Sequence, residues 1–186
     1  MTLTEYFEFK EYVSDGFLDE GQIHRFHNQQ LEQKFKAFKK LNINESSSIL
    51  DISTGAGFWP FFLYKSGIKN VSFTERPKVA HSMERRDRFY RRGFEYLYRV
   101  TNLKPFFLEI KRNERLVLPK RYDFITMFGM GFLVKYTFEE KKFLIDNLHE
   151  YTDNVYIRVN DYSEDLIDYP EGFYYDKAQG CICFRS

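Results

Sequence analysis

Residues 48–75 constrain the fold of this chain more than any other part of the sequence. They begin with a short apolar run that is typical of a buried strand, and they end on the carboxylate of Glu75. A strand, a loop of small residues, a helix and a second strand are expected at 49–52, 54–57, 58–64 and 70–74. Small loop residues let a ligand approach the backbone closely. This order of elements predicts a βαβ unit of the nucleotide-binding type.

The glycine spacing distinguishes between classes of nucleotide. A dinucleotide site has the pattern G-x-G-x-x-G, whose third glycine lets the helix pack closely on the strand. Gly55 and Gly57 fit the first two positions, but Pro60 occupies the third. The phosphate loop G-x-x-x-x-G-K-[ST] does not occur in the sequence. The stretch is therefore a poor match to sites for NAD, FAD, ATP or GTP.

Residues 51–57, Asp-Ile-Ser-Thr-Gly-Ala-Gly, resemble motif I of the class I S-adenosylmethionine-dependent methyltransferases. In that motif an acid and an apolar residue precede G-x-G-x-G, and Ser53 stands here at the first glycine. The resemblance implies an α/β fold, a Rossmann-like class I methyltransferase sandwich with a mostly parallel seven-stranded sheet and a C-terminal antiparallel hairpin strand. It also implies S-adenosyl-L-methionine as the cofactor.

The same resemblance implies roles by position. The loop 55–57 would pass beneath the methionine part of the cofactor, and Asp51 would lie close to the amino-acid moiety, directly or through water. Glu75 would accept hydrogen bonds from both ribose hydroxyls. Glu109 is the candidate beside the adenine, with Asn113 close behind it. The cofactor-binding candidates are Asp51, Ser53, Thr54, Gly55, Gly57, Phe58, Glu75, Arg76 and Glu109.

Length and composition favour one domain. We expect residues 1–186 to form it, with an N-terminal helical cap at 1–45 and a cofactor-binding core at 46–186. No run of about 20 uncharged apolar residues occurs, so no membrane span is expected. Cys181 and Cys183 are alternate residues of an expected strand, which favours thiols in a reducing cytoplasm. A net charge of +1 argues against a wholesale nucleic-acid binder.

Two long amphipathic patterns flank the βαβ unit. Apolar residues recur at helical spacing over 20–41, after a capping-box pattern at Asp19 and Gln22. Residues 76–99 carry many arginines among aromatic side chains, and Gly93 is expected to divide them into two helices. This basic stretch fits an RNA-facing surface, but a solvated helix face or a docking surface for an acidic partner explains it as well.

The rest of the chain continues the alternation of strands and helices. A second capping box at Thr137 and Glu140 predicts a helix that reaches about residue 150. Further strands are expected at 105–110, 122–128 and 154–159, and a closing hairpin at 173–176 and 181–185. No metal site is expected, since His24 and His27 alone supply too few ligands.

The acceptor is less constrained than the cofactor. Methyltransferases that act on exocyclic amino groups of bases often carry Asn- or Asp-Pro-Pro-aromatic after the fourth strand, whereas residues 128–132 are Phe-Gly-Met-Gly-Phe. This sequence disfavours base methylation and suits a pocket for a small acceptor. Asp161 follows the last parallel strand and is the first candidate for a general base, with His27 as the second. Turn formation explains Asp161 at least as well, and a surface position without a catalytic role explains His27 better.

These observations predict a methyltransferase that acts on an oxygen or nitrogen atom of a small-molecule acceptor. The first alternative is an RNA or protein methyltransferase that uses the basic 76–99 stretch. The second is a non-catalytic binding protein with the methyltransferase fold. A third is a plain α/β domain in which the glycine loop only turns the chain.

Overall fold

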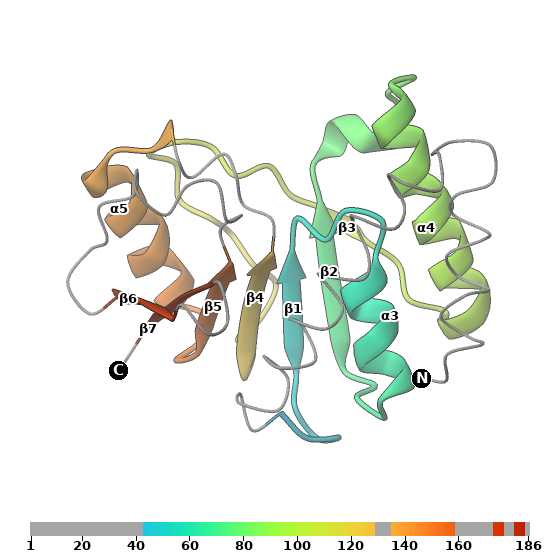
Figure 1. The fold of residues 1–186 in the computed structure, drawn as a ribbon, viewed down its shortest axis with the longest axis horizontal. Helices are drawn as coiled ribbons and strands as arrows, with labels where there is room; N and C mark the ends of the chain where they lie inside the picture. The colour runs from blue at the N-terminus through green and yellow to red at the C-terminus, as the bar shows by residue number, and fades with distance from the viewer. Residues whose placement is uncertain (1–42, 129–134, 159–172, 177–180, 185–186) are drawn as a thin grey trace.

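A computed structural model describes residues 43–128, 135–158, 173–176 and 181–184 (Figure 1). Its strands are β1 (Ile49–Ile52), β2 (Val71–Glu75), β3 (Phe106–Phe107), β4 (Phe124–Phe128), β5 (Val155–Arg158), β6 (Phe173–Asp176) and β7 (Cys181–Phe184). Its helices are α3 (Phe58–Lys65), the short 3-10 helix η1 (Pro77–Ala80), α4 (Arg85–Thr101) and α5 (Phe138–His149).

The strands form one sheet in the order β3-β2-β1-β4-β5-β7-β6. From β3 to β5 in this order every pair is parallel, whereas β7 pairs antiparallel with both β5 and β6. Figure 1 shows α3 beside β2 with α4 beyond it, and α5 at the opposite end of the sheet next to β5. The predicted Rossmann-like α/β fold with a parallel sheet is confirmed.

Strand β1 is buried on both faces, which explains its nearly continuous apolar sequence. Ile49 packs in one cluster with Trp59 and Phe62 of α3. Leu50 and Ile52 belong to another cluster, which contains apolar residues of α5 and β5. Because side chains of a strand alternate between its faces, the remaining residue of β1, Asp51, lies on the same face as Ile49. It is the only acid of β1, and it is buried.

The basic stretch after β2 differs from the sequence prediction. The chain forms η1 and then one continuous helix, α4, that passes through Gly93. A Cβ atom at Gly93 would lie 1.9 Å from the carbonyl oxygen of Ala56. The glycine therefore permits α4 to approach the loop after β1, and the prediction that it divides the helix was wrong.

Two other local predictions have different outcomes. Strand β3 contains only Phe106–Phe107, because its single partner β2 ends at Glu75, which pairs with Phe107. The capping box at the start of α5 is confirmed, since the Thr137 side chain accepts from the Glu140 N–H and the Glu140 side chain accepts from the Thr137 N–H. Each cap satisfies one of the amide donors that a helix leaves unpaired at its start.

Several predictions lie outside the described residues. They are the helix at 20–41, most of the cap at 1–45, the segment after β4, and the candidate bases His27 and Asp161. Among the described residues, no helix combines the length and the apolar character that crossing a membrane requires.

Candidate functional site

The candidate site lies at the carboxyl edge of the parallel strands. Strand β1 pairs in parallel with β2 on one side and with β4 on the other, so the order in which the chain adds strands to the sheet reverses at this point. Open α/β sheets bind ligands outside such a switch point. The loop after β1 and the end of β2 meet here, at the top of the view in Figure 1.

The loop after β1 has an unusual backbone that β2 anchors. Ser53, Gly55 and Gly57 all adopt left-handed conformations, with φ of 58°, 64° and 85°. The Ser53 N–H donates to Thr74 Oγ1 at 3.2 Å, and the next N–H along the loop donates to the Thr74 carbonyl at 3.0 Å. A non-glycine residue in this region carries strain of about 1–2 kcal/mol. Ser53 thus adopts a conformation that a glycine would adopt without strain.

Glu75 joins the end of β2 to this loop. Its carboxylate accepts the Gly55 N–H at 3.0 Å through Oε2 and the Arg76 N–H at 2.9 Å through Oε1. Burial raises the pKa of Glu75 above its usual value, against the lowering effect of these two backbone hydrogen bonds and of the Arg76 charge. The carboxylate has about four acceptor positions, and the two backbone N–H groups occupy two of them.

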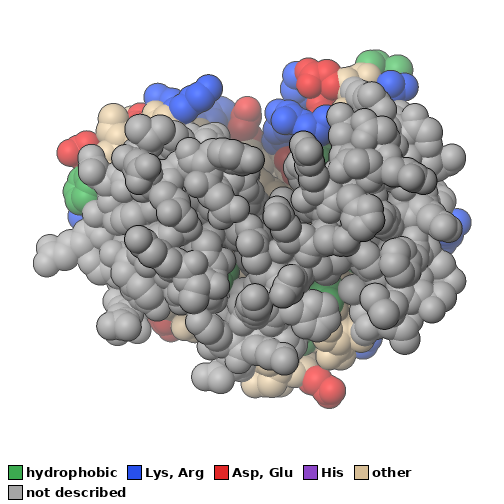
Figure 2. All heavy atoms as spheres, viewed as in Figure 1, with side chains coloured by type: hydrophobic (Ala, Val, Ile, Leu, Met, Phe, Trp, Pro, Cys, Tyr) green, Lys and Arg blue, Asp and Glu red, His purple; other side chains and the backbone are tan. Residues whose placement is uncertain are grey.

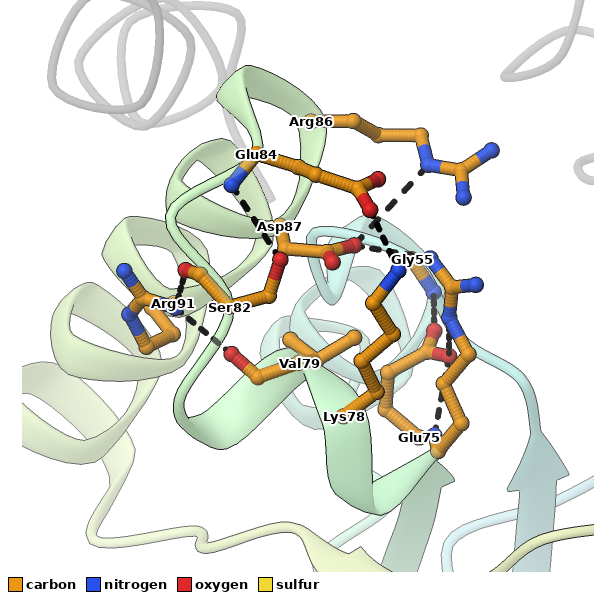
Figure 3. A network of polar contacts seen from close by, with 10 residues as sticks. Gly55, Glu75, Lys78, Val79, Ser82, Glu84, Arg86, Asp87 and Arg91 are labelled. Carbon is orange, nitrogen blue, oxygen red and sulfur yellow. Dashed lines mark hydrogen bonds and ion pairs between the residues drawn. The ribbon is translucent and has the colours of Figure 1, made fainter.

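A second carboxylate, Asp87 of α4, belongs to the same polar network as Glu75 (Figure 3). Arg76 connects them, with Nη2 at 2.7 Å from Asp87 Oδ1 and Nε at 3.9 Å from Glu75 Oε1. Although burial raises the pKa of Asp87, a hydrogen bond from Ser82 and the charges of Arg76 and Arg86 outweigh that effect and lower it. One network therefore contains two buried acids whose pKa values shift in opposite directions.

Part of the basic character of residues 76–99 is used within the protein. Arg91 Nη1 donates to the carbonyls of Val79 and Ser82 at 2.7 and 2.6 Å, and so holds η1 against α4. Arg76 and Arg86 both neighbour Asp87. Figure 2 shows basic and acidic side chains mixed along the upper edge of this face.

Helix α4 covers the loop closely, which the sequence did not predict. Tyr90 lies over Gly55, where a Cβ atom would be 3.6 Å from its ring. At Gly57 a Cβ atom would be 2.2 Å from Leu97 Cδ1. The pKa of Tyr90 is raised by burial and by the Glu75 charge, so its phenol belongs to the same site. In the sequence Tyr90 is one of several apolar positions of an amphipathic helix, and nothing distinguishes it from its neighbours.

Where β1 neighbours β4, Asp51 takes part in a buried hydrogen-bond chain. Thr126 Oγ1 on β4 donates to Asp51 Oδ1 at 2.7 Å. The same hydroxyl accepts the indole N–H of Trp59 on α3 at 3.1 Å. Asp51 and Thr126 are direct partners in the β1–β4 register. The sequence gives no signal for this contact, because the two residues are 75 positions apart.

The structure brings most of the cofactor candidates together. Asp51, Ser53, Thr54, Gly55, Gly57, Phe58, Glu75 and Arg76 all lie at the end of β1, on the loop, at the start of α3 or at the end of β2. Phe58 is buried in a cluster with Phe94 and Leu97 of α4. Glu109 is exposed two residues beyond β3, close in sequence to Leu108, whose N–H donates to the Glu75 carbonyl at 2.9 Å. The ligand contacts of all these residues stay predictions.

Polar groups with unused hydrogen-bonding capacity lie at this edge. Thr54 Oγ1 is buried and has no hydrogen-bond partner among the described residues. Glu75 keeps acceptor positions beyond the two that backbone N–H groups fill. A buried polar group without a partner costs stability, so a polar ligand at this edge would satisfy groups that the described residues leave unpaired.

Solved structures with similar folds include S-adenosylmethionine-dependent methyltransferases. The Haloferax volcanii methyltransferase candidate bound to its activator Trm112 has a TM-score of 0.55 at 13% identity, with 86% of this chain and 67% of that chain covered. A methyltransferase from Clostridium acetobutylicum has 0.51 at 14%, with 94% and 65% covered. A cyclopropane-fatty-acyl-phospholipid synthase-like protein from Lactobacillus casei has 0.53 at 12%, with 81% and 56% covered.

These similarities show that the chain has the class I S-adenosylmethionine-dependent methyltransferase fold, as its sequence predicts. The chain spans between 56% and 67% of the length of these three proteins. By sequence, neither a protein-family model nor a curated protein matches it.

Proposed function

We propose that this chain binds S-adenosylmethionine and transfers its methyl group to an oxygen or nitrogen atom of a small-molecule acceptor. We also propose that β6 and β7 complete the seven-stranded class I sheet. The observation that carries the proposal is the 3.0 Å hydrogen bond from the Gly55 N–H to Glu75 Oε2. This bond joins the glycine loop to the acid at the end of β2, and the buried Asp51 of β1 comes just before the same loop.

Each group at this edge of the sheet has a proposed role. Glu75 would accept both ribose hydroxyls on its remaining acceptor positions. The left-handed loop would let the ligand approach its backbone. Asp51 would accept from the ammonium group of the amino-acid end, and Tyr90 would line the side of the pocket formed by α4. Glu109 would lie near the adenine, since it follows β3 next to β2.

The bound donor supplies an activated methyl group on a sulfonium. The main task of the protein is therefore to align the acceptor for in-line attack. A base is needed only where the acceptor atom must lose a proton. Asp161 and His27 are the proposed bases, and both lie outside the described residues.

Titration calorimetry with S-adenosylmethionine and S-adenosylhomocysteine tests the cofactor. We expect binding by the unaltered protein and its loss in Glu75→Ala, which removes the acceptor of the ribose. Gly55→Val should also lose binding, because valine rarely adopts the left-handed conformation of residue 55. Glu114→Ala, which changes a 62% exposed side chain, should bind as the unaltered protein does. Absence of binding by the folded protein would overturn the proposal.

The internal contacts of the basic stretch favour a small acceptor over RNA. Arg76 pairs with the buried Asp87, and Arg91 binds two carbonyls of the η1 turn. An RNA methyltransferase would show binding that falls steeply with salt and weakens in the triple variant Arg85→Ala, Arg86→Ala and Arg88→Ala. No shift of RNA on native gels at low salt would exclude this alternative.

A non-catalytic binding protein is the other alternative. It would bind the cofactor in the titration but transfer no methyl group to any of a panel of hydroxyl- and amine-bearing compounds. Release of S-adenosylhomocysteine in the presence of one acceptor would exclude it.

A further inference from the structure

Three side chains form a hydrogen-bond chain beneath the glycine loop. Trp59 and Thr126 are 0% exposed, and Asp51 is 1% exposed. Trp59 Nε1 lies 3.1 Å from Thr126 Oγ1, which lies 2.7 Å from Asp51 Oδ1. The hydrogen-bond chain therefore runs from α3 through β4 to the end of β1, and it connects β1 and α3 with a strand that lies 67 to 75 positions later in the sequence.

The direction of each hydrogen bond follows from the chemistry of the groups. An indole N–H can only donate, and a hydroxyl has one proton and two lone pairs. Trp59 therefore occupies a lone pair of Thr126 and leaves the hydroxyl proton for another acceptor. Asp51 Oδ1 at 2.7 Å is a better acceptor than the Leu50 carbonyl at 3.5 Å, both by distance and by charge. Thr126 thus directs its proton to the carboxylate.

The position of Thr126 argues that this contact has a purpose beyond packing. Its neighbours on β4, Ile125 and Met127, are apolar and completely buried. Valine has nearly the same shape as threonine and buries no polar atom, so it would suit a central strand better. The hydroxyl at this position pairs with two buried groups that valine could not serve, the indole N–H of Trp59 and the carboxylate of Asp51.

We propose that Thr126 and Trp59 are positioning residues that fix the Asp51 carboxylate toward the α-ammonium group of the donor. This inference rests on the proposed function. It makes the site selective for nucleosides that carry an amino-acid group over nucleosides that lack one. The stiff χ1 of a β-branched threonine and the buried indole would keep the carboxylate in one rotamer before the ligand arrives.

Two ligands separate positioning from a structural role. S-adenosylhomocysteine carries the amino-acid group, whereas 5′-methylthioadenosine has the same adenosine and sulfur without it. In Thr126→Val we expect about tenfold weaker binding of S-adenosylhomocysteine, the effect of losing one hydrogen bond to a charged group. Binding of 5′-methylthioadenosine should stay within about twofold, because Asp51 does not contact it.

Conservative variants serve as matched controls. Thr126→Ser keeps the hydroxyl and should bind S-adenosylhomocysteine within about threefold of the unaltered protein. Trp59→Phe keeps most of the ring and removes the N–H, and it should weaken S-adenosylhomocysteine alone by about threefold to tenfold. If Thr126→Val does not fold, the comparison of these two variants still tests the inference.

Three results would overturn it. Equal weakening of both ligands in Thr126→Val and Trp59→Phe would mean that the chain only supports the fold. Unchanged binding of both ligands by these variants would mean that Asp51 is oriented without them. Failure of the unaltered protein to bind either ligand would remove the proposed function as well, so the two proposals fail in distinguishable ways.

Discussion

The carboxylates of Asp51 and Glu75 lie at the ends of adjacent strands, but the protein holds them by different means. Asp51 accepts from a threonine hydroxyl that a buried indole orients. Glu75 accepts from two backbone N–H groups and neighbours the Arg76–Asp87 ion pair. The hydroxyl and the indole N–H of the first arrangement are uncharged donors, whereas the second arrangement contains acids and arginines that reach the surface.

This difference predicts how each side responds to conditions. Salt screens charges near the surface, and pH changes their ionisation. A buried hydrogen bond from an uncharged donor is screened little by salt. Substitutions of Thr126 and Trp59 should therefore act mainly through shape and hydrogen-bonding groups. The Glu75 side should be sensitive to pH and salt as well.

The largest expected loss of stability comes from the contact between α4 and the glycine loop, which follows Asp51 and is bound by Glu75. Gly93→Ala would place a Cβ atom 1.9 Å from the Ala56 carbonyl oxygen, and neither backbone can yield without moving a helix. We expect the free energy of unfolding in urea to fall by about 3 kcal/mol. Glu95→Ala on the exposed face of α4 is the control and should change it by less than about 0.5 kcal/mol. A loss below about 1 kcal/mol in Gly93→Ala would contradict this close approach.

Thr126→Val should have the next largest effect. It removes the donor to Asp51 and the acceptor of Trp59 while keeping the volume of the side chain. We expect a loss of about 2 kcal/mol in the free energy of unfolding. The loss should be the same at low and high salt, because the donors involved are neutral. Thr126→Ser should recover the part that is due to the hydroxyl, and a loss that shrinks markedly in salt would contradict this account.

On the charged side, Arg76→Met should cost less. The Arg76 side chain is 35% exposed, so water can partly replace its contact with Asp87, and we expect a loss of about 1 kcal/mol. In the Asp87→Asn background the same change should cost clearly less, because the charge of Asp87, the nearer of the two buried acids beside Arg76, is gone. High salt should reduce the loss. Equal costs in both backgrounds would show that the pair is not coupled.

The sequence predicts one of these sides better than the other. Gly55, Gly57 and Glu75 form a local pattern in one βαβ unit, so residue spacing alone indicates where they meet. The partners of Asp51 and the position of Tyr90 depend on which strands and helices become neighbours. Gly93 illustrates the limit, because a glycine that breaks a helix and one that admits a close neighbour look identical in sequence. The contacts of Arg76 and Arg91 within the protein cannot be read from the sequence either, because they also depend on which elements become neighbours.

The smallest effects concern pH, where Glu75 and Asp87 should act in opposite directions. The pKa of Glu75 is raised from 4.5 by burial, so the folded protein holds this proton more tightly than the unfolded chain. Its contribution to stability is therefore complete below pH 4.5 and is lost as the pH rises through the folded pKa. The pKa of Asp87 is lowered from 3.8 by Ser82 and two arginines despite burial. Its contribution is present above pH 3.8 and is lost as the pH falls through the folded pKa.

Urea unfolding of Glu75→Gln and Asp87→Asn at a series of pH values separates the two contributions. Relative to the unaltered protein, Glu75→Gln should gain stability as the pH rises above 4.5, because it lacks the penalty of a buried charge. Asp87→Asn should lose relative stability as the pH rises towards 3.8, because it lacks a carboxylate that the arginines stabilise. Each substitution also changes hydrogen bonds, but that change is a constant offset and leaves the slopes unaffected. Slopes of the same sign in both variants would show that burial, rather than the arrangement of Arg76 and Arg86, determines the ionisation of this network.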